Sequence, residues 1–154
     1  MSPIIRVLLA SVLLVLLAAV PTIEGSSTGK QNQANGCSCH GTTSGITANH
    51  NFPTTYTPGT VYSITIDGTG GTQAYVGGFS LQVDKGSFSN AGSRTQFAGL
   101  SATHTNSGSL SWTMDWTAPT SGSGSVNMAL AVLQANGNSA TSGDTWDTTS
   151  ATII

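Results

Sequence analysis

The sequence predicts an all-β fold, a sandwich of two sheets, in a chain that is exported across a membrane. Two observations predict the sandwich. Several short segments alternate apolar with polar residues, as strands with one buried face do, and turns rich in Gly, Pro and Asn separate them. A third observation, an apolar run near the N-terminus, predicts the export.

The first 25 residues have the pattern of a signal peptide. Arg6 supplies a positive charge, residues 7–20 are apolar apart from Ser11, and Pro21 ends the run. The apolar run is short for a transmembrane helix, which needs about 20 residues, although an uncleaved N-terminal anchor is the alternative interpretation. We therefore expect residues 1–25 to form a signal helix that is removed, and the mature protein to be secreted or held at the cell surface without a membrane contact of its own.

The composition suits strands and turns and excludes two classes of partner. The chain is rich in Gly, Ser, Thr and Asn, and only 6% of its residues are charged. Helices favour residues such as Glu and Lys on their exposed faces, so this composition suits strands and turns better. The net charge is −2 and Lys and Arg together number four, so no basic surface for nucleic acid or anionic lipid is expected. The sequence thus predicts a polar, weakly charged extracellular protein.

The mature chain divides into a polar leader, residues 26–55, and a sandwich domain, residues 56–154. Up to about Pro53 the leader has no apolar periodicity, so we expect it to be loop. Residues 68–71 are expected to end the first strand, and Asn136-Gly137 to form a turn. The expected strands cover residues 61–66, 79–83, 110–114 and 126–132, with closing strands near Trp146 and at 152–154. Trp112 and Trp116 are expected in the core, with sugar binding as the less favoured role.

Seven short motifs occur in a fixed order along this part of the chain. They are Pro58-Gly59, residues 78–83 (GFSLQV), residues 86–88 (GSF), Thr103-His104-Thr105, residues 116–119 (WTAP), residues 122–126, and residues 136–144 from Asn136-Gly137 to Gly143-Asp144. This order resembles the reeler (reelin-like) domain, an immunoglobulin-like β-sandwich of extracellular proteins. With Cys-x-Cys-His ahead of it, the chain is more similar still to the prokaryotic surface domain called choice-of-anchor V.

The resemblance runs from about Cys37 to the C-terminus, with two departures. The disulfides common in animal reeler domains have no counterpart, because both cysteines lie in the leader. No anchoring segment follows the sandwich, and the sequence ends at Ile154, so we expect either a released protein or a fragment of a longer one.

Residues Cys37-Ser38-Cys39-His40 form the one dense cluster of strong ligands in the sequence. Attachment of haem c ordinarily uses C-x-x-C-H, in which two thiols bond the porphyrin and the His binds the iron. One intervening residue is missing here, but Cys39 and His40 keep their usual relation. The resembling prokaryotic domains often carry C-x-x-C-H at this place, which favours haem c. The resemblance and the motif together make Cys37, Cys39 and His40 candidate haem-binding residues.

A second axial ligand for the iron could come from His104, His50 or a methionine. Three other uses of the motif compete with haem: a strained Cys37–Cys39 disulfide, a copper or zinc site that adds a further His, and no role beyond ordering a loop. His104 has an equally good structural interpretation as a hydrogen-bonding residue. Asp144 is expected to cap a turn rather than to bind calcium, since a single carboxylate supplies too few oxygen ligands for that ion.

No catalytic constellation is present, so an enzyme is not expected. Two functions remain. The first is a haem-carrying, electron-transfer protein that works with an unidentified redox partner. The second is an adhesive or structural module, with a disulfide or a non-haem metal at the motif, that binds an unidentified extracellular protein or associates with itself through sheet edges.

Overall fold

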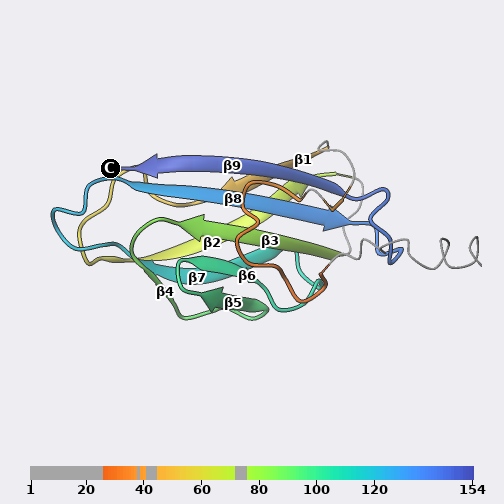
Figure 1. Cartoon of the computed structure of the whole chain (residues 1–154), viewed down its shortest axis with the longest axis horizontal. Helices are drawn as coiled ribbons and strands as arrows, with labels where there is room; N and C mark the ends of the chain where they lie inside the picture. The colour runs from red at the N-terminus through yellow and green to blue at the C-terminus, as the bar shows by residue number, and fades with distance from the viewer. Residues whose placement is uncertain (1–25, 38, 41–44, 72–75) are drawn as a thin grey trace, which may run out of the picture.

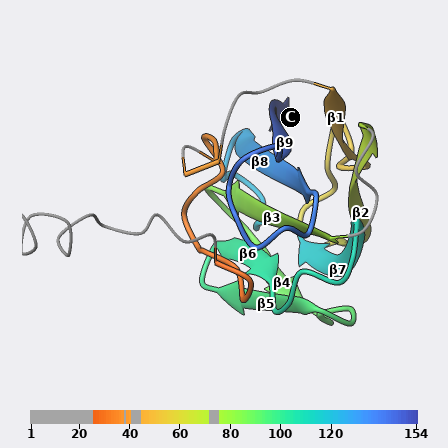
Figure 2. The same cartoon turned by 90° about the vertical axis from the view of Figure 1, so that its right-hand side faces the viewer.

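The chain folds as a β-sandwich (Figure 1), and the view of Figure 2, along the strands, separates its two layers. The computed structural model describes residues 26–37, 39–40, 45–71 and 76–154. The predicted signal peptide, residues 1–25, lies outside the described residues. Within them the secondary structure consists of the strands β1 (Ile46–His50), β2 (Val61–Gly70), β3 (Val76–Val83), β4 (Ser87–Ser89), β5 (Thr95–Ala98), β6 (Ser101–His104), β7 (Ser111–Thr117), β8 (Val126–Ala135) and β9 (Thr145–Ile153).

The strands form two antiparallel sheets. One has four strands in the order β1-β2-β7-β4, and the other has five in the order β5-β6-β3-β8-β9. Strands distant in sequence are therefore neighbours, as β2 and β7 are, which requires the chain to cross between the layers. The predicted all-β sandwich is confirmed.

Alternating apolar side chains fill the space between the sheets. On β7, Trp112, Met114 and Trp116 are each at most 1% exposed, while the alternate residues Ser111 and Thr113 face outward. Aromatic rings at this spacing bury large apolar areas and dominate the stability of a small core. The predicted core position of the two tryptophans is confirmed, as are the predicted inward faces of β2, β3 and β8.

Several predicted boundaries were wrong. The leader was expected to be loop as far as Pro53, but Ile46–His50 forms β1 and pairs with β2. The expected break at residues 68–71 is also wrong, because β2 continues to Gly70, opposite Ile46. A glycine fits at position 68 because a Cβ there would lie 2.9 Å from a methyl carbon of Val132. The two expected closing strands are one continuous strand, β9.

The first part of the leader lies along the outer face of the five-stranded sheet (orange in Figure 2). The backbone N–H of Gln33 donates to the Ser80 hydroxyl at 3.0 Å, and that of Asn32 to the Ser101 hydroxyl at 3.3 Å. Both serines are at most 4% exposed. Ser80 was expected to face solvent from a half-buried strand, but the leader covers this side of β3.

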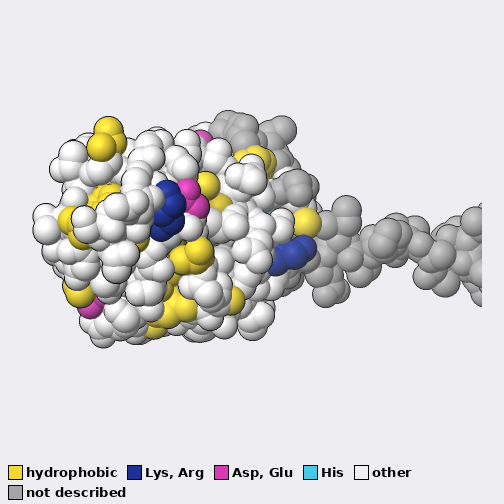
Figure 3. Space-filling model, turned by 60° about the vertical axis from the view of Figure 1, so that its left-hand side comes forward, with side chains coloured by type: hydrophobic (Ala, Val, Ile, Leu, Met, Phe, Trp, Pro, Cys, Tyr) yellow, Lys and Arg dark blue, Asp and Glu magenta, His cyan; other side chains and the backbone are white. Residues whose placement is uncertain are grey.

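The surface agrees with the charge-poor composition. The face drawn in Figure 3 consists mainly of backbone and uncharged polar side chains, with few charged groups. In the parts of the chain that the structure describes, we find no helix with the length and apolarity needed to cross a bilayer.

Candidate functional site at the Cys-x-Cys-His segment

The Cys-x-Cys-His segment begins where the leader meets the start of β9. Gly36, directly before Cys37, packs against the ring of Trp146. A Cβ at this position would lie 2.9 Å from Cη2 of Trp146, and the backbone φ of Gly36 is 143°, a conformation that favours glycine. The indole ring therefore fixes the chain at the entrance to the segment.

The two cysteines differ in their surroundings, and both are free thiols. Cys37 is partly buried, whereas Cys39 is exposed. Burial, with a smaller contribution from Cys39, raises the pKa of the Cys37 thiol to about 11. Cys37 is therefore protonated near neutral pH, and because a thiol must ionise to attack or to bind a metal, it is poorly suited to nucleophilic chemistry.

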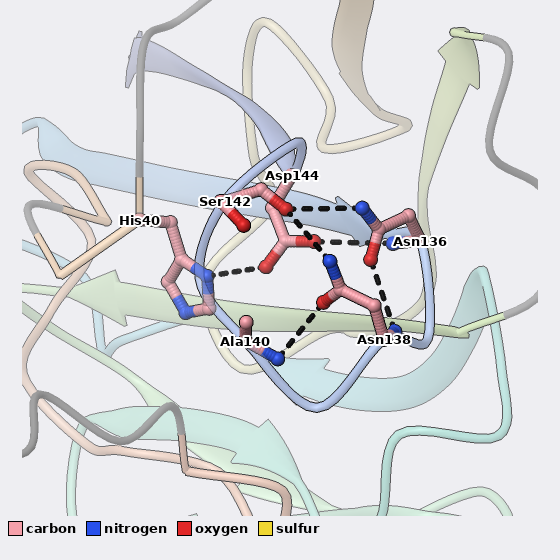
Figure 4. A network of polar contacts seen from close by, with 6 residues as sticks. All are labelled: His40, Asn136, Asn138, Ala140, Ser142 and Asp144. Atoms are coloured by element: carbon pink, nitrogen blue, oxygen red, sulfur yellow. Dashed lines mark hydrogen bonds and ion pairs between the residues drawn. The ribbon is translucent and has the colours of Figure 1, made fainter.

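His40 is held by a buried carboxylate. Its Nδ1 lies 2.7 Å from Oδ2 of Asp144, whose side chain is 2% exposed, against 14% for His40 (Figure 4). An ionised carboxylate only accepts hydrogen bonds, so Nδ1 of His40 is the donor. In the neutral ring Nε2 then keeps its lone pair and is the nitrogen able to bind a metal. Ligating histidines are commonly oriented by a carboxylate in this way.

The opposite flank of the segment is closed by the backbone. The N–H of His40 donates to the carbonyl of Cys37 at 2.8 Å, which forms a turn across the motif. Trp146 contacts Gly36, which precedes the turn, and Asp144 binds His40, which ends it. Asp144 and Trp146 are two positions apart at the start of β9. The segment is thus held at both ends by the same short stretch of chain.

Asp144 owes its position to the loop that joins β8 to β9. Its Oδ1 accepts the backbone N–H of Asn136 at 3.1 Å, which closes the loop. Side-chain amides brace the interior: Asn136 accepts the N–H of Asn138 at 3.0 Å, and Asn138 accepts that of Ala140 at 2.8 Å. Both asparagines also donate to the Ser142 carbonyl (Figure 4). Such local bonds order a loop without secondary structure. Asp144 caps this turn, as the sequence indicated, and in addition binds His40.

His104, a candidate axial ligand, lies in a different environment. It is 8% exposed, and its Nδ1 accepts the backbone N–H of Phe79 at 3.1 Å. Its Nε2 lies 3.2 Å from the carbonyl of Ser26 and donates to it. Burial lowers the pKa of His104, and the carbonyl oxygens of Phe79, 3.3 Å from Nδ1, and of Ser26 partly oppose this because they would accept from a protonated ring. Both nitrogens are therefore engaged with the backbone, and the structural interpretation of this residue fits its geometry.

His50, the other candidate, lies at the far end of β1. Its Nδ1 accepts the N–H of Phe52 at 3.2 Å, and burial lowers its pKa. The start of β1 is beside Thr145, and five residues of strand span about 13 Å between first and last, so His50 is remote from Asp144. Two of the three methionines, Met114 and Met128, are buried in the core, and Met1 lies outside the described residues.

The structure therefore brings His40 together with Asp144, with Cys39 next to His40 in the chain, and leaves His104 and His50 elsewhere. Across the described ranges, no three or more His, Cys, Asp or Glu side chains are grouped so as to hold a metal ion. The contacts of Asp144 and Trp146 with the motif were not predicted. One signal for the Asp144 contact is present in the sequence, the Asn-rich stretch that ends in Gly143-Asp144, but 104 positions separate Asp144 from His40.

No protein-family model matches this chain, and a search of the curated proteins found no match. Two solved structures are similar to it. The structure described as "Crystal structure of human F-spondin reeler domain (fragment 1)" has a TM-score of 0.51 at 18% identity and covers 82% of this chain and 96% of its own. A second, "The crystal structure of Reelin-N domain of F-spondin", has a TM-score of 0.49 at 21% identity, over 71% of this chain and 80% of its own. The predicted reeler-type fold is confirmed by the first of these.

Proposed function

We propose that this chain is an exported, non-catalytic β-sandwich protein that carries covalent haem on its Cys-x-Cys-His segment for electron transfer outside the cell. The observation that carries the proposal is the bond between Nδ1 of His40 and buried Asp144, 2.7 Å long. It leaves Nε2 of His40 as the free ring nitrogen, next in sequence to an exposed thiol, Cys39. An iron ligand adjacent to an attachment thiol is the arrangement that haem c requires.

The residues present fit the group in three respects. Cys39 is exposed and can reach a large planar ligand. His40 is partly exposed, and in the neutral ring its carboxylate partner selects the tautomer in which Nε2 carries the lone pair. Only 6% of the residues of the chain are charged, so no dense cluster of carboxylates is expected to repel the anionic propionates of a porphyrin. When bound, the haem would supply a one-electron iron couple.

The chain's own residues have distinct roles in this proposal. His40 would hold the iron through Nε2, and Asp144 would hold the proton on Nδ1 and keep the ring in one orientation. The reeler-type fold supports an extracellular location, as does the apolar run at residues 7–20, which has the length of a signal peptide core. The raised pKa of Cys37 keeps its thiol protonated near neutral pH, which argues against its acting as a nucleophile.

The test is to produce the full chain, with residues 1–25 intact, in a host that expresses haem c maturation proteins. We expect a Soret band that survives acid–acetone extraction and an intact mass equal to the processed chain plus one haem. Protein from the same host without the maturation genes is the control. Purified protein with the mass of the bare chain, or two hydrogens lighter through a Cys37–Cys39 disulfide, would contradict the proposal. Copper or zinc retained in place of haem would contradict it as well.

A matched pair of histidine variants locates the iron ligand. We expect His40→Ala to change the visible spectrum of the loaded protein, since the iron loses its ligand. His50→Ala should leave the spectrum unchanged, because His50 lies at the other end of β1. A spectrum that responds to His50→Ala and not to His40→Ala would contradict the assignment of His40.

A further inference from the structure

Two contacts at the start of β9, which together we call the clamp, give the two cysteines of the motif different surroundings. Trp146 packs on Gly36, directly before Cys37, and Asp144 binds His40, directly after Cys39. Between these points, the N–H of His40 donates to the Cys37 carbonyl at 2.8 Å. The result is a short turn in which Cys39 is exposed and Cys37 is partly buried.

If both cysteine sulfurs were exposed to bond a haem, the clamp would be disturbed. To expose Cys37, the chain must lift Gly36 from the indole ring or open the turn to His40. Either change also acts on the bond between His40 and Asp144, because the segment is only four residues long. The spacing adds to this, since Cys-x-Cys has one residue fewer than the C-x-x-C-H pattern that presents two thiols together.

From this geometry we propose that the protein bonds its haem through a single thioether, at Cys39, and that Cys37 remains a free thiol. This inference rests on the proposed function and specifies its attachment chemistry. The S–H of Cys39 adds across one vinyl group of the haem: the sulfur bonds to the carbon next to the ring, and the hydrogen passes to the terminal carbon. Nothing leaves and no oxidant is needed, so the product mass is the sum of the two reactants.

The test compares the wild type with the matched variants Cys37→Ser and Cys39→Ser, all produced with haem c maturation proteins. Each protein is reduced, unfolded and alkylated with iodoacetamide, and its intact mass is measured. We expect the wild type to carry one haem and one alkylated thiol. Cys37→Ser should carry one haem and no alkylated thiol, and Cys39→Ser should carry no haem and one alkylated thiol.

The outcomes separate this inference from the function on which it rests. Wild-type protein that carries haem but has no alkylatable thiol overturns the single thioether and leaves the proposed function standing. Loss of haem from Cys37→Ser, or its retention by Cys39→Ser, does the same. A wild type with no haem overturns both.

A measurement on the haem-free protein tests the geometric premise by itself. In the folded, reduced chain at pH 7.5 we expect iodoacetamide to modify Cys39 at least about 10-fold faster than Cys37, because only an exposed thiolate reacts readily. Trp146→Ala should reduce this ratio by releasing Gly36, whereas Trp116→Phe, in the core on β7 of the other sheet, should not. Equal rates for the two cysteines in the wild type would overturn the inference.

Discussion

Two histidines of this protein, His104 and His40, show how burial separates a structural residue from one available for binding. His104 is 8% exposed, and both of its nitrogens contact backbone groups. His40 uses one nitrogen, and its partner is a carboxylate. A buried ring with no free nitrogen stabilises the fold and can bind nothing further, whereas a ring with one nitrogen fixed and one free is prepared to bind a metal. The number of ring nitrogens left free distinguishes the two roles.

Removing the ring of His104 should have the largest effect on stability. His104→Ala loses hydrogen bonds to Phe79 and Ser26 and leaves a cavity beside Trp112, so we expect the free energy of unfolding to fall by about 3 kcal/mol. Urea unfolding monitored by tryptophan fluorescence measures this. His40→Ala is the matched variant and should lower the free energy of unfolding by about 1 kcal/mol, because the His40 ring is the more exposed partner of its pair with Asp144. Equal losses for the two variants would break the comparison.

The packing around His104 can be tested through the glycine that faces it. A Cβ at Gly78 would clash with the imidazole of His104, 3.0 Å from its Nδ1 and nearer still to Cε1. Since the ring is held on both sides, we expect Gly78→Ala to cost about 2 kcal/mol. In a His104→Ala background the same change should cost much less, and the double-mutant cycle gives the coupling energy. Additive losses would show that the ring is free to move.

At the His40 site we expect a smaller effect on stability. Asp144→Asn keeps the shape of the side chain but removes the charge, so the free energy of unfolding should fall by about 1 kcal/mol. Alkylation of Cys37 in the folded protein should accelerate at the same time, because the turn loses one of its two fixed ends. Asp67→Asn, in a pair with Asn49 on the β1–β2 ladder, is the control and should leave the alkylation rate unchanged.

The smallest predicted effect is a loss of stability in acid. The pKa of His104 is below its ordinary value of 6.5 in the folded protein, so the unfolded chain binds a proton more readily. Stability from this source is complete above pH 6.5 and is lost as the pH falls toward the folded-state pKa, with a slope of at most about 1.4 kcal/mol per pH unit. His50 acts in the same direction, so the measurement compares the wild type, His50→Gln and His104→Gln between pH 4.5 and 8. An unchanged slope in His104→Gln would contradict this origin.

The strands that the sequence predicted are those whose large apolar side chains alternate and lie between the two sheets. Residues 79–83 and 126–132 alternate cleanly because the side chains between the sheets are apolar. β1 was missed because its sequence, ITANH, has a single large apolar residue; the strand is stabilised by pairing with β2 rather than by its own pattern. Local alternation reports burial, and a strand at a sheet edge buries little.

The candidate site was predicted only in part, for a related reason. Cys39 and His40 are adjacent in the chain, so a motif could identify them. Their environment depends on Asp144, which is 104 positions from His40, and on the Trp146 ring against Gly36. Contacts between distant segments leave no periodic signal in one sequence. The predicted turn-capping role of Asp144 followed from local chemistry, and its bond to His40 could be found only from the fold.

The separation of 104 positions between His40 and Asp144 makes the surroundings of the motif a product of folding. A chain that has not yet formed β9 and the loop before it lacks both the carboxylate that orients His40 and the indole ring against Gly36. In such a chain neither end of the motif is held, so we expect any covalent addition to these cysteines to be easiest before β9 is in place.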